Sequence, residues 1–476
     1  MLEKIFKLKE NGTDVKTEVI AGLTTFMTMA YIIALNPNLL TGFTANGGQE
    51  LWNAVFLATC IASAFGTILM AFIANKPFAM SAGMGLNSFF AVVVANIATI
   101  AGVSYLEGFR AGLCIILIEG IVFIILSALN VREKIVQAIP LGVRLGISPA
   151  IGLMLLNIGF GSNAGVYSET GGPFYAMANF FGSLTASYAK ETMGSGYPVM
   201  VLTVITMFAG LFTIVALDHK KVKGSVLYGI LTGSVIYWAG EYFVLHINPF
   251  ASLATASWLP PFKDMATLTL FKFDFNVLKS LGMFTVVTLV LTFCIIDMFD
   301  TIGTLVGTAS RANMLDENGN MPNMKEALLS DACGTVCGAL TGTSTITTFV
   351  ESASGVEAGG RTGLTSLVTG LIFLACMFIS PIAAIIPAAA TSSALIYVGI
   401  LMLQGLKNID FDDISVCVPV FIMLVAMPIS GSIGHGIGLG LIAYTIIKFI
   451  TGKAKEVSPL TLVLSILFLV KFFFAF

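Results

Sequence analysis

The stretch "LTGTSTITTFVESASGV" at positions 340–356 interrupts a chain that is otherwise strongly apolar. It is rich in glycine, serine and threonine, and its "TSTITT" portion is β-branched and polar, which is more typical of a strand than of a helix. The stretch does not supply the roughly 20 apolar residues that a membrane-spanning helix needs. We therefore expect a short strand followed by a half-helix that begins near Glu351.

A second stretch of this kind, "FAMSAGMGLNSFFAVVV", lies at positions 78–94 and is preceded by Pro77. It is also short and contains glycine and serine where a spanning helix would be uniformly apolar. Matching interrupted segments in the two halves of a membrane protein indicate the binding site of a secondary transporter. The pair of stretches therefore predicts both an internal repeat and the place of the site.

The composition supports a membrane protein. The chain has 476 residues, of which 57% are hydrophobic and 11% charged, and its mean hydropathy is +0.93. Soluble domains carry roughly 25% charged residues. We expect about fourteen membrane segments, at 19–40, 52–74, 78–98, 109–129, 140–160, 197–217, 225–245, 281–305, 326–341, 343–357, 363–386, 390–406, 414–430 and 432–450. The apolar stretch 459–476 is either a further span or an interfacial helix.

The interrupted segments are the third of the first seven spans and the third of the last seven. Because seven is odd, two such halves would have opposite orientations in the membrane. A weak internal sequence similarity supports two related halves, between "LTTFMTMAYI" at 23–32 and "LTFCIIDMFD" at 291–300. The pattern predicts an all-α polytopic fold built as a 7+7 inverted repeat.

Loop charges predict the orientation. With the N-terminus in the cytoplasm, eighteen of the 24 Lys and Arg residues fall on the inner side and five on the outer side. This bias follows the positive-inside rule. The inner residues are Lys4, Lys7, Lys9, Lys16, Lys76, Arg132, Lys134, Arg144, Lys220, Lys221, Lys223, Arg311, Lys325, Arg361, Lys407, Lys448, Lys453 and Lys455; the outer ones are Arg110, Lys190, Lys263, Lys272 and Lys279.

Two acids, Asp297 and Asp300, lie inside the apolar span 281–305. An ionised carboxylate near the centre of a bilayer is disfavoured by at least about 2.5–3.5 kcal/mol. Residues three apart share one helical face, so both side chains can point together into a protein interior or a wet cavity. Two close carboxylates in a low dielectric tend to hold one proton between them, which would suit a proton carrier. The structural alternative is a hydrogen-bonded pair that fixes this span to a neighbour.

Four motifs in the same order resemble the AzgA-like purine permeases of the nucleobase–cation symporter fold. They are "AGLTTFMTMAYIIALNP", "GMGLNSFFA", "DMFDTIGTL" and "TSTITTFVESASGVEAGGRTGLTSL". The resemblance implies proton-coupled uptake of hypoxanthine, guanine or adenine in the cell membrane, by an elevator-like movement of a core domain against a gate domain, with no enzymatic activity and no cofactor. The core would comprise residues 1–131 and 251–388, and the gate residues 132–250 and 389–476.

The resemblance assigns substrate binding to Glu351, Asn87 and Asp297. Glu351 can accept N–H donors from a purine, and Asn87 offers both a donor and an acceptor. The structural alternatives are that Glu351 only caps its own helix and that Asn87 is only an N-cap. Phe89 is a candidate for stacking on the base, although packing is the commoner role of phenylalanine. The candidates for proton coupling are Asp297, Asp300 and Glu351. Na⁺ is the less favoured coupling ion.

Other polar groups in the spans receive weaker assignments. We expect Asp331 to be a helix-contact residue and Glu119 to be structural, and Glu357 can pair with Arg361 at i,i+4. The stretch "GRTGLTS" lacks the lysine and the spacing of a nucleotide-binding loop, so transport would be driven by an ion gradient. We expect neither a metal site nor a nucleic-acid partner.

Several alternatives stay open from the sequence. Two aspartates in a span also suit an intramembrane aspartyl enzyme, but such dyads bring the acids from different segments. A uracil or xanthine permease would share the fold. A related sulfate or bicarbonate carrier should have a cation where this chain has Glu351. Besides a purine, a proton and the bilayer, a homodimer is left open.

Overall fold

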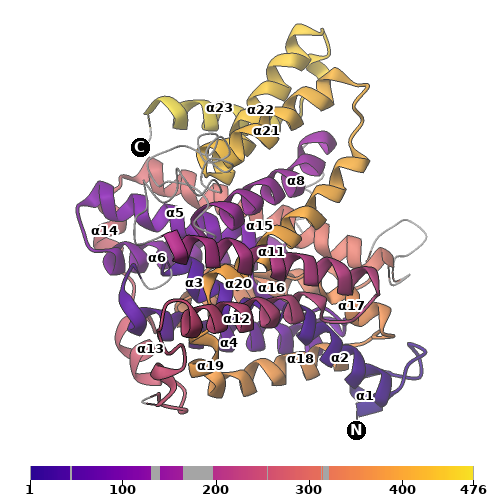
Figure 1. Ribbon diagram of the computed structural model, residues 1–476. Coiled ribbons are helices and arrows are strands. Elements are labelled where there is room, and N and C mark those ends of the chain that lie inside the picture. The colour runs from indigo at the N-terminus through magenta and orange to yellow at the C-terminus, as the bar shows by residue number, and fades with distance from the viewer. Residues whose placement is uncertain are drawn as a thin grey trace. The chain divides into compact units, whose positions relative to one another are not determined.

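The computed structural model describes residues 2–42, 45–129, 140–163, 197–254, 256–311, 314 and 321–474. Within these ranges the chain is helical, apart from connecting segments and two strands of three residues each (Figure 1). Arg132, Lys134 and Lys190, which contributed to the predicted orientation, and the predicted boundary at 131–132 lie outside the described residues.

Each of the fourteen predicted segments coincides with a helix, or with a strand followed by a helix. In the first half these are α2 (Val15–Met29) with α3 (Ile32–Leu40), α4 (Gly48–Leu69), β1 (Met80–Ala82) with α5 (Met84–Ala101), α6 (Tyr105–Ala128), α8 (Leu141–Ile158), α11 (Tyr197–His219) and α12 (Ser225–Phe243). In the second half they are α15 (Met283–Arg311), α16 (Met324–Thr341), β2 (Ile346–Thr348) with α17 (Ser352–Glu357), α18 (Gly363–Ala375) with α19 (Ser380–Ala384), α20 (Ala388–Met402), α21 (Ile414–Ser430) and α22 (Ile433–Ile450). In the described part, ten helices are long and apolar enough to cross a membrane. The exact count of fourteen therefore stays a prediction.

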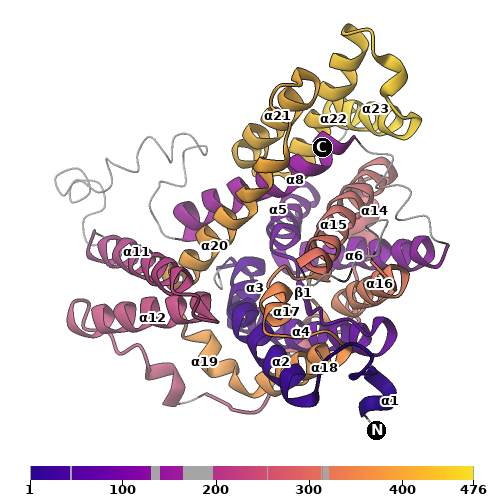
Figure 2. The same cartoon turned by 90° about the vertical axis from the view of Figure 1, so that its right-hand side faces the viewer.

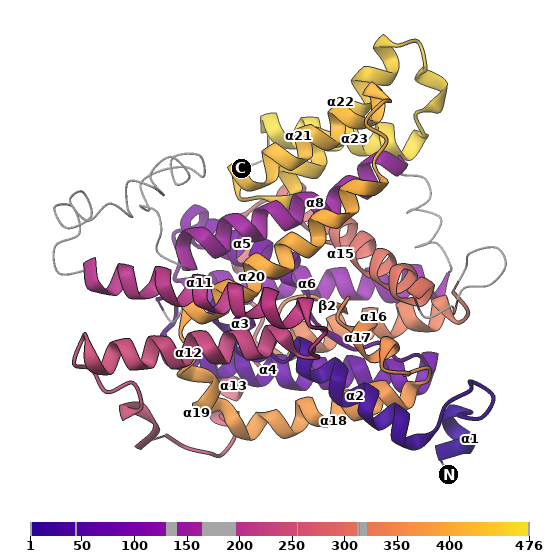
Figure 3. The same cartoon turned by 45° about the vertical axis from the view of Figure 1, so that its right-hand side comes forward.

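The chain divides into two compact units. Unit 1 comprises Met1–Ile139, Ser257–Ser380 and Leu467–Phe476, and unit 2 comprises Pro140–Ala256 and Pro381–Ile466. Both interrupted segments belong to unit 1. In unit 1, α17 packs against α2 and α15, and β1 packs against α4 (Figure 2). In unit 2, α11, α12 and α20 pack against one another (Figure 3).

The two interrupted segments meet as a small antiparallel sheet. Met80 pairs with Thr348, Ser81 with Thr347 and Ala82 with Ile346. The ladder continues beyond the strands, because Gly83 N donates to Thr345 O at 3.1 Å and Phe349 N donates to Ala79 O at 3.0 Å. The predicted fold of helices with two broken strand and half-helix segments is thus confirmed.

Side chains from the surrounding helices satisfy the outward backbone groups of this sheet. Thr67 of α4 accepts from Met80 N at 2.9 Å and lies 3.1 Å from Met80 O. Thr335 of α16 donates to Ile346 O at 2.9 Å. Non-helical backbone at membrane depth is tolerated only where protein or water satisfies it, so these threonines are what permit strands here.

The three residues before β2 each bind a polar side chain from a different helix. Asn36 of α3 donates to Thr343 Oγ1 at 2.8 Å, and Thr345 donates to Glu119 of α6 at 2.7 Å. Between them, Ser344 donates to the Asn87 side-chain oxygen of α5. The polar residues that distinguish this stretch from a spanning helix therefore connect it to three other spans.

Unit 2 packs through small residues. A Cβ on Gly152 of α8 would lie 2.7 Å from Gly399 O of α20, and one on Gly399 would lie 2.7 Å from Gly152 O. The glycines of "GSIGHGIGLG" serve a similar purpose, because Gly436 and Gly440 of α22 leave room for methionines of α21. Such close backbone approach is the usual way in which helices pack in lipid.

The C-terminal stretch forms one more helix, α23 (Pro459–Phe474). It is tied to α22, since the Thr445 and Ser465 hydroxyls lie 2.8 Å apart. Lys448 of α22 donates to Glu456, just before α23, at 2.6 Å, and this hydrogen bond holds the pKa of Glu456 below its ordinary value. Whether α23 crosses the bilayer or lies at its surface stays a prediction.

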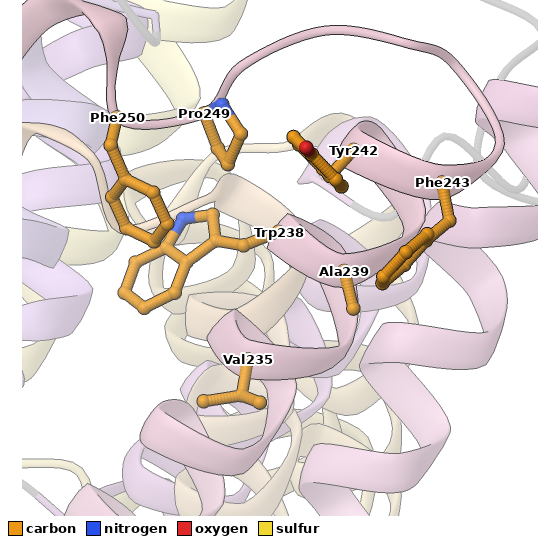
Figure 4. A pocket seen from close by; sticks show the side chains of 7 residues that line it. All are labelled: Val235, Trp238, Ala239, Tyr242, Phe243, Pro249 and Phe250. Carbon is orange, nitrogen blue, oxygen red and sulfur yellow. The ribbon is translucent and has the colours of Figure 1, made fainter.

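A surface hollow of about 400 Å³ lies at the end of α12 (Figure 4). Its lining holds no acidic side chain, and the Trp238 indole N–H already donates to Ile385 O at 3.0 Å. The hollow is thus chemically unlike the interrupted segments, where acids gather.

Glu18 of α2 caps a helix far away in sequence. Its fully buried carboxylate accepts from the backbone N–H groups of Arg361, Thr362 and Thr365 at 2.8, 3.3 and 3.1 Å, and from the Thr365 hydroxyl at 2.6 Å. These donors lie just before α18 and in its first turn, where N–H groups have no earlier helical carbonyls to bind. Glu18 therefore fixes α2 to the start of α18.

We predict that Glu18→Ala destabilises the protein by roughly 2–4 kcal/mol, because buried N–H donors lose a charged acceptor. Thermal unfolding in detergent should show a clear drop relative to wild type. Glu357→Ala, which removes an exposed carboxylate nearby, is the matched control and should change stability by no more than about 0.5 kcal/mol. Equal stability of the two variants would contradict the capping role.

Candidate functional site

The polar residues singled out in the sequence gather in unit 1 around the small sheet. Glu351 lies between β2 and α17, and Asn87 lies in the first turn of α5. Asp297 and Asp300 lie on α15, which packs against both β2 and α17. The four come from segments separated by up to about 260 residues and converge because the two interrupted segments pair.

Glu351 is held by the first span of the chain. The Tyr31 hydroxyl donates to Glu351 Oε1, and Thr28 Oγ1 donates to the Glu351 backbone oxygen at 3.4 Å. Glu351 occupies the N-cap position of α17, but its side chain makes no capping hydrogen bond. The alternative that Glu351 caps its own helix is therefore wrong, and its carboxylate faces span 1 instead.

Asn87 joins the two interrupted segments. Its amide donates to Ala82 O at 3.1 Å and accepts from the Ser344 hydroxyl. The N-cap of α5 is Gly83, so the alternative that Asn87 is the N-cap is wrong. Gly83 has the close approach that its lack of a side chain predicts, since a Cβ there would lie 2.6 Å from Thr347 Cγ2.

Phe89 packs inside unit 1. It is almost fully buried, and its ring centroid lies 4.7 Å from that of Phe293 on α15, in a tilted arrangement. Phe90 makes an edge-to-face contact with Phe109 of α6 at 5.3 Å. These contacts give both rings a packing role between α5 and its neighbours.

Asp297 belongs to a hydrogen-bonded cluster centred on Thr301, one turn later on α15. Thr301 Oγ1 lies 3.0 Å from Asp297 Oδ1, 3.0 Å from Asp331 Oδ1 of α16 and 2.7 Å from Thr347 Oγ1 of β2. All four residues are buried. We call this set the Thr301 cluster. It links α15, α16 and the centre of the sheet, so Asp331 is both a helix-contact residue and a neighbour of Asp297.

The protons of the Thr301 cluster can be counted. Thr301 has one hydroxyl proton, and an ionised carboxylate can only accept hydrogen bonds. With both acids ionised, Thr301 can donate to one of them, which leaves two oxygens 3.0 Å apart without a proton between them. All three contacts become hydrogen bonds when Thr347 donates to Thr301 and one of the two acids carries a proton.

Asp300 faces another part of the site. Its Oδ2 lies 3.6 Å from the place of a Cβ on Gly83, at the start of α5. Its carboxyl group also interacts electrostatically with Asp331 and Glu351. Thr301 therefore links Asp297 to Asp331 of α16, while Asp300 lies near the start of α5.

Two other expected roles are clarified. Glu119 is fully buried and accepts from Thr345, so it supports the approach to β2. Arg361 does not form the pair with Glu357 that the i,i+4 spacing allows, as far as the described residues show. Its guanidinium donates to Val356 O at 2.7 Å and Gly360 O at 2.8 Å, which satisfies carbonyls at the end of α17.

Sequence reasoning missed Tyr31 and Thr301. A signal for Thr301 was present, because it lies four residues after Asp297 and hence on the same helical face. Tyr31 stands within "TTFMTMAYI", but nothing in that motif shows that span 1 bends there toward a residue 320 positions later. Among the described residues, no group of three or more His, Cys, Asp or Glu side chains is arranged to hold a metal ion.

The arrangement suits recognition of an uncharged polar molecule by hydrogen bonds. It supplies carboxylates at Glu351, Asp297 and Asp300, an amide at Asn87 and the hydroxyl of Thr301. Carboxylates favour ligands that carry N–H donors. They disfavour anionic ligands, because like charges repel.

Comparisons with known proteins agree with this chemistry. A family model described as "Permease family" (xan-ur permease) matches residues 16–430. The chain is 37% identical over 476 residues to the adenine permease AdeP of Escherichia coli K12, covering 100% of this chain and 96% of that one. It is 37% identical over 473 residues to the guanine/hypoxanthine permease PbuO of Bacillus subtilis 168, covering 98% and 100%.

A solved structure shares the fold. The transmembrane domain of a cyanobacterial bicarbonate transporter, BicA, aligns with a TM-score of 0.62 at 16% identity, covering 88% of this chain and 97% of that one. At that identity the likeness concerns the fold alone. The full-length match to named permeases carries the assignment: the chain belongs to the permease family that includes the adenine and guanine/hypoxanthine permeases, and it is a transporter rather than an enzyme.

Proposed function

We propose that this permease is a secondary transporter that takes up purine nucleobases together with protons. The observation that carries the proposal is the placement of Glu351 at the break between β2 and α17, where the Tyr31 hydroxyl donates to its carboxylate and Asp300 interacts with it electrostatically. Relatives that match over nearly the whole chain and are named for adenine and for guanine with hypoxanthine support a purine substrate.

The chemistry of the site suits a purine. A purine base is flat, uncharged near neutral pH, and carries ring and exocyclic N–H donors beside acceptor nitrogens and carbonyls. Glu351 accepts from such donors, Asp297 is the second acceptor, and Asn87 has one amide proton beyond the bond to Ala82 O. A related carrier of bicarbonate or sulfate would need positive charge here, which the acids Glu351, Asp297 and Asp300 do not supply.

Proton coupling follows from the Thr301 cluster. Asp297 and Asp331 both contact the Thr301 hydroxyl, and both contacts are hydrogen bonds when one of the two acids carries a proton. Loss of that proton turns a bonded contact into a repulsive one, so arrival and departure of a proton change the cluster beside the site. Asp300 and Glu351 provide neighbouring carboxylates that can exchange it. We favour H⁺ over Na⁺ as the coupling ion because one added proton allows every contact of the Thr301 cluster to be a hydrogen bond.

The two units suggest how transport occurs. We assign unit 1, which holds the site, as the core domain and unit 2 as the gate domain, and we propose that the core carries the base across the membrane in an elevator-like movement. Neutralising an acid on loading would lower the cost of that movement, since buried charge is expensive in lipid. We also propose that the N-terminus lies in the cytoplasm, which the lysine and arginine bias supports, and that the protein resides in the cell membrane, as its resemblance to purine permeases implies.

We predict that adenine, hypoxanthine and guanine compete for one site and that inosine does not. The two interrupted segments pack closely, since a Cβ on Gly83 would lie 2.6 Å from Thr347 Cγ2, so we expect room for a flat base and none for an attached ribose. Uptake of labelled hypoxanthine by a strain that expresses the protein checks this, with uracil and xanthine as further competitors. Inosine competing as well as hypoxanthine would contradict a closed site, and uracil as the best competitor would favour a uracil permease.

We expect Glu351→Gln to weaken base binding by roughly 1.5–3 kcal/mol, because a charged acceptor becomes a neutral amide. Its NH₂ group would also face the N–H of the base. Binding should be measured calorimetrically on purified protein of normal yield. Glu357→Gln at the exposed end of α17 is the control and should bind normally; wild-type affinity in Glu351→Gln would remove Glu351 from the site.

We predict that Asp297→Asn abolishes accumulation of purine against a gradient, while Asp300→Asn transports with an altered pH dependence. An amide at 297 cannot take part in the proton exchange with Asp331. The measurement is purine-driven proton influx into liposomes. Should Asp297→Asn still move protons with purine at the wild-type ratio, the coupling proton would reside elsewhere, with Glu351 the next candidate.

A further inference from the structure

We infer that Tyr31 is a positioning residue that orients the Glu351 carboxylate and thereby sets the affinity for the substrate. The inference rests on the proposed function of Glu351. Tyr31 lies at the junction of α2 and α3, where span 1 is interrupted, and it is 3% exposed. Its hydroxyl donates to Glu351 Oε1.

Span 1 holds Glu351 at two points. Thr28 donates to the Glu351 backbone oxygen at 3.4 Å, and Tyr31, one turn later on the same side of the chain, holds the carboxylate. Gly355 of α17 lies against Thr25, one turn before Thr28, so closely that no side chain fits there. One face of span 1 therefore follows α17 from its N-terminal residue to its middle.

The two contacts act on different parts of Glu351, its backbone and its side chain. Thr28 contacts the backbone, which the sheet and α17 already position. Tyr31 contacts the end of a side chain with three rotatable bonds, and Glu351 makes no capping contact with its own helix. A phenol that donates to a carboxylate forms a strong charge-assisted hydrogen bond. It keeps the carboxylate in one orientation before substrate arrives.

This orientation has a defined effect on binding. A carboxylate accepts on both oxygens, so Oε2 and the remaining lone pair of Oε1 stay available for the N–H groups of a base. Without Tyr31 the carboxylate must be ordered when substrate binds, and the free energy that this ordering costs weakens binding. Movement of the loaded core does not require the hydroxyl, so the maximal rate should be kept.

The test is Tyr31→Phe, which removes one oxygen and retains the ring. We expect KM for hypoxanthine uptake to rise about 5–20-fold, with the maximal rate within about 2-fold of wild type. This is less than the roughly 10–150-fold that loss of a whole hydrogen bond to a charged group would give, because Tyr31 acts on the substrate only through Glu351. Tyr105→Phe is the matched control, because it removes a hydroxyl that donates at 2.6 Å to the backbone oxygen of Leu40 in the same unit. It should leave KM unchanged.

A double-mutant comparison separates positioning from general structure. In the Glu351→Gln background, Tyr31→Phe should raise KM by no more than about 2-fold, because a neutral amide binds the phenol weakly and the two changes act on one contact. An equal rise in both backgrounds would overturn the inference. So would an unchanged KM in Tyr31→Phe alone, or a fall in maximal rate with unchanged KM.

Direct binding of hypoxanthine to purified Tyr31→Phe protein covers the case in which the variant is poorly expressed or fails to transport. Thermal unfolding alongside confirms that the protein measured is folded. Weakened binding by folded protein supports the inference, and unchanged binding overturns it. Failure of the proposed function is a separate result, because it would appear as normal affinity in Glu351→Gln, whatever the behaviour of Tyr31→Phe.

Discussion

The need to satisfy backbone hydrogen bonds inside an apolar interior determines most of this structure. Two strands of three residues pair in the middle of unit 1, where water is not at hand to bind their outer N–H and C=O groups. Thr67 and Thr335 bind those groups, and Asn36, Asn87 and Glu119 bind the hydroxyl residues that precede β2. An unsatisfied polar group in such surroundings costs several kcal/mol. The strands are therefore stable here only because these side chains bind them, and the side chains are in turn satisfied by the strands and the residues before β2.

The same constraint explains where the acids are. Once a polar sheet is buried, the helices around it must present polar faces, and a carboxylate on such a face lies against protein rather than lipid. Asp297 is an example, because Thr301 connects it both to Asp331 and to Thr347 at the centre of the sheet. The residues that satisfy the backbone of the sheet are thus joined to the two acids that we propose as the proton carrier.

Recognition and support are divided among the polar residues. Asn87 links the two interrupted segments and Glu119 binds Thr345 before β2, whereas the Glu351 side chain makes no capping hydrogen bond with α17 and accepts from Tyr31 of span 1. In the site that we propose, the acceptor carboxylate is therefore oriented before the base arrives. This division is consistent with a family whose members are named for different purines, because small changes around one acceptor can alter the preferred base while the sheet stays intact.

The sequence alone determined the membrane class, the segments and the two interruptions, because composition and local pattern report directly on burial in lipid and on backbone conformation. The resemblance carried by the ordered motifs also predicted one shared site for Glu351, Asn87, Asp297 and Asp300, and that assignment stays a prediction. Only the tertiary structure decided which groups touch. Nothing local in the sequence links Tyr31 to Glu351 or Asp297 to Asp331, because those contacts depend on how separate spans cross, and hydrogen-bond partners at such crossings are set by three-dimensional packing rather than by spacing along the chain.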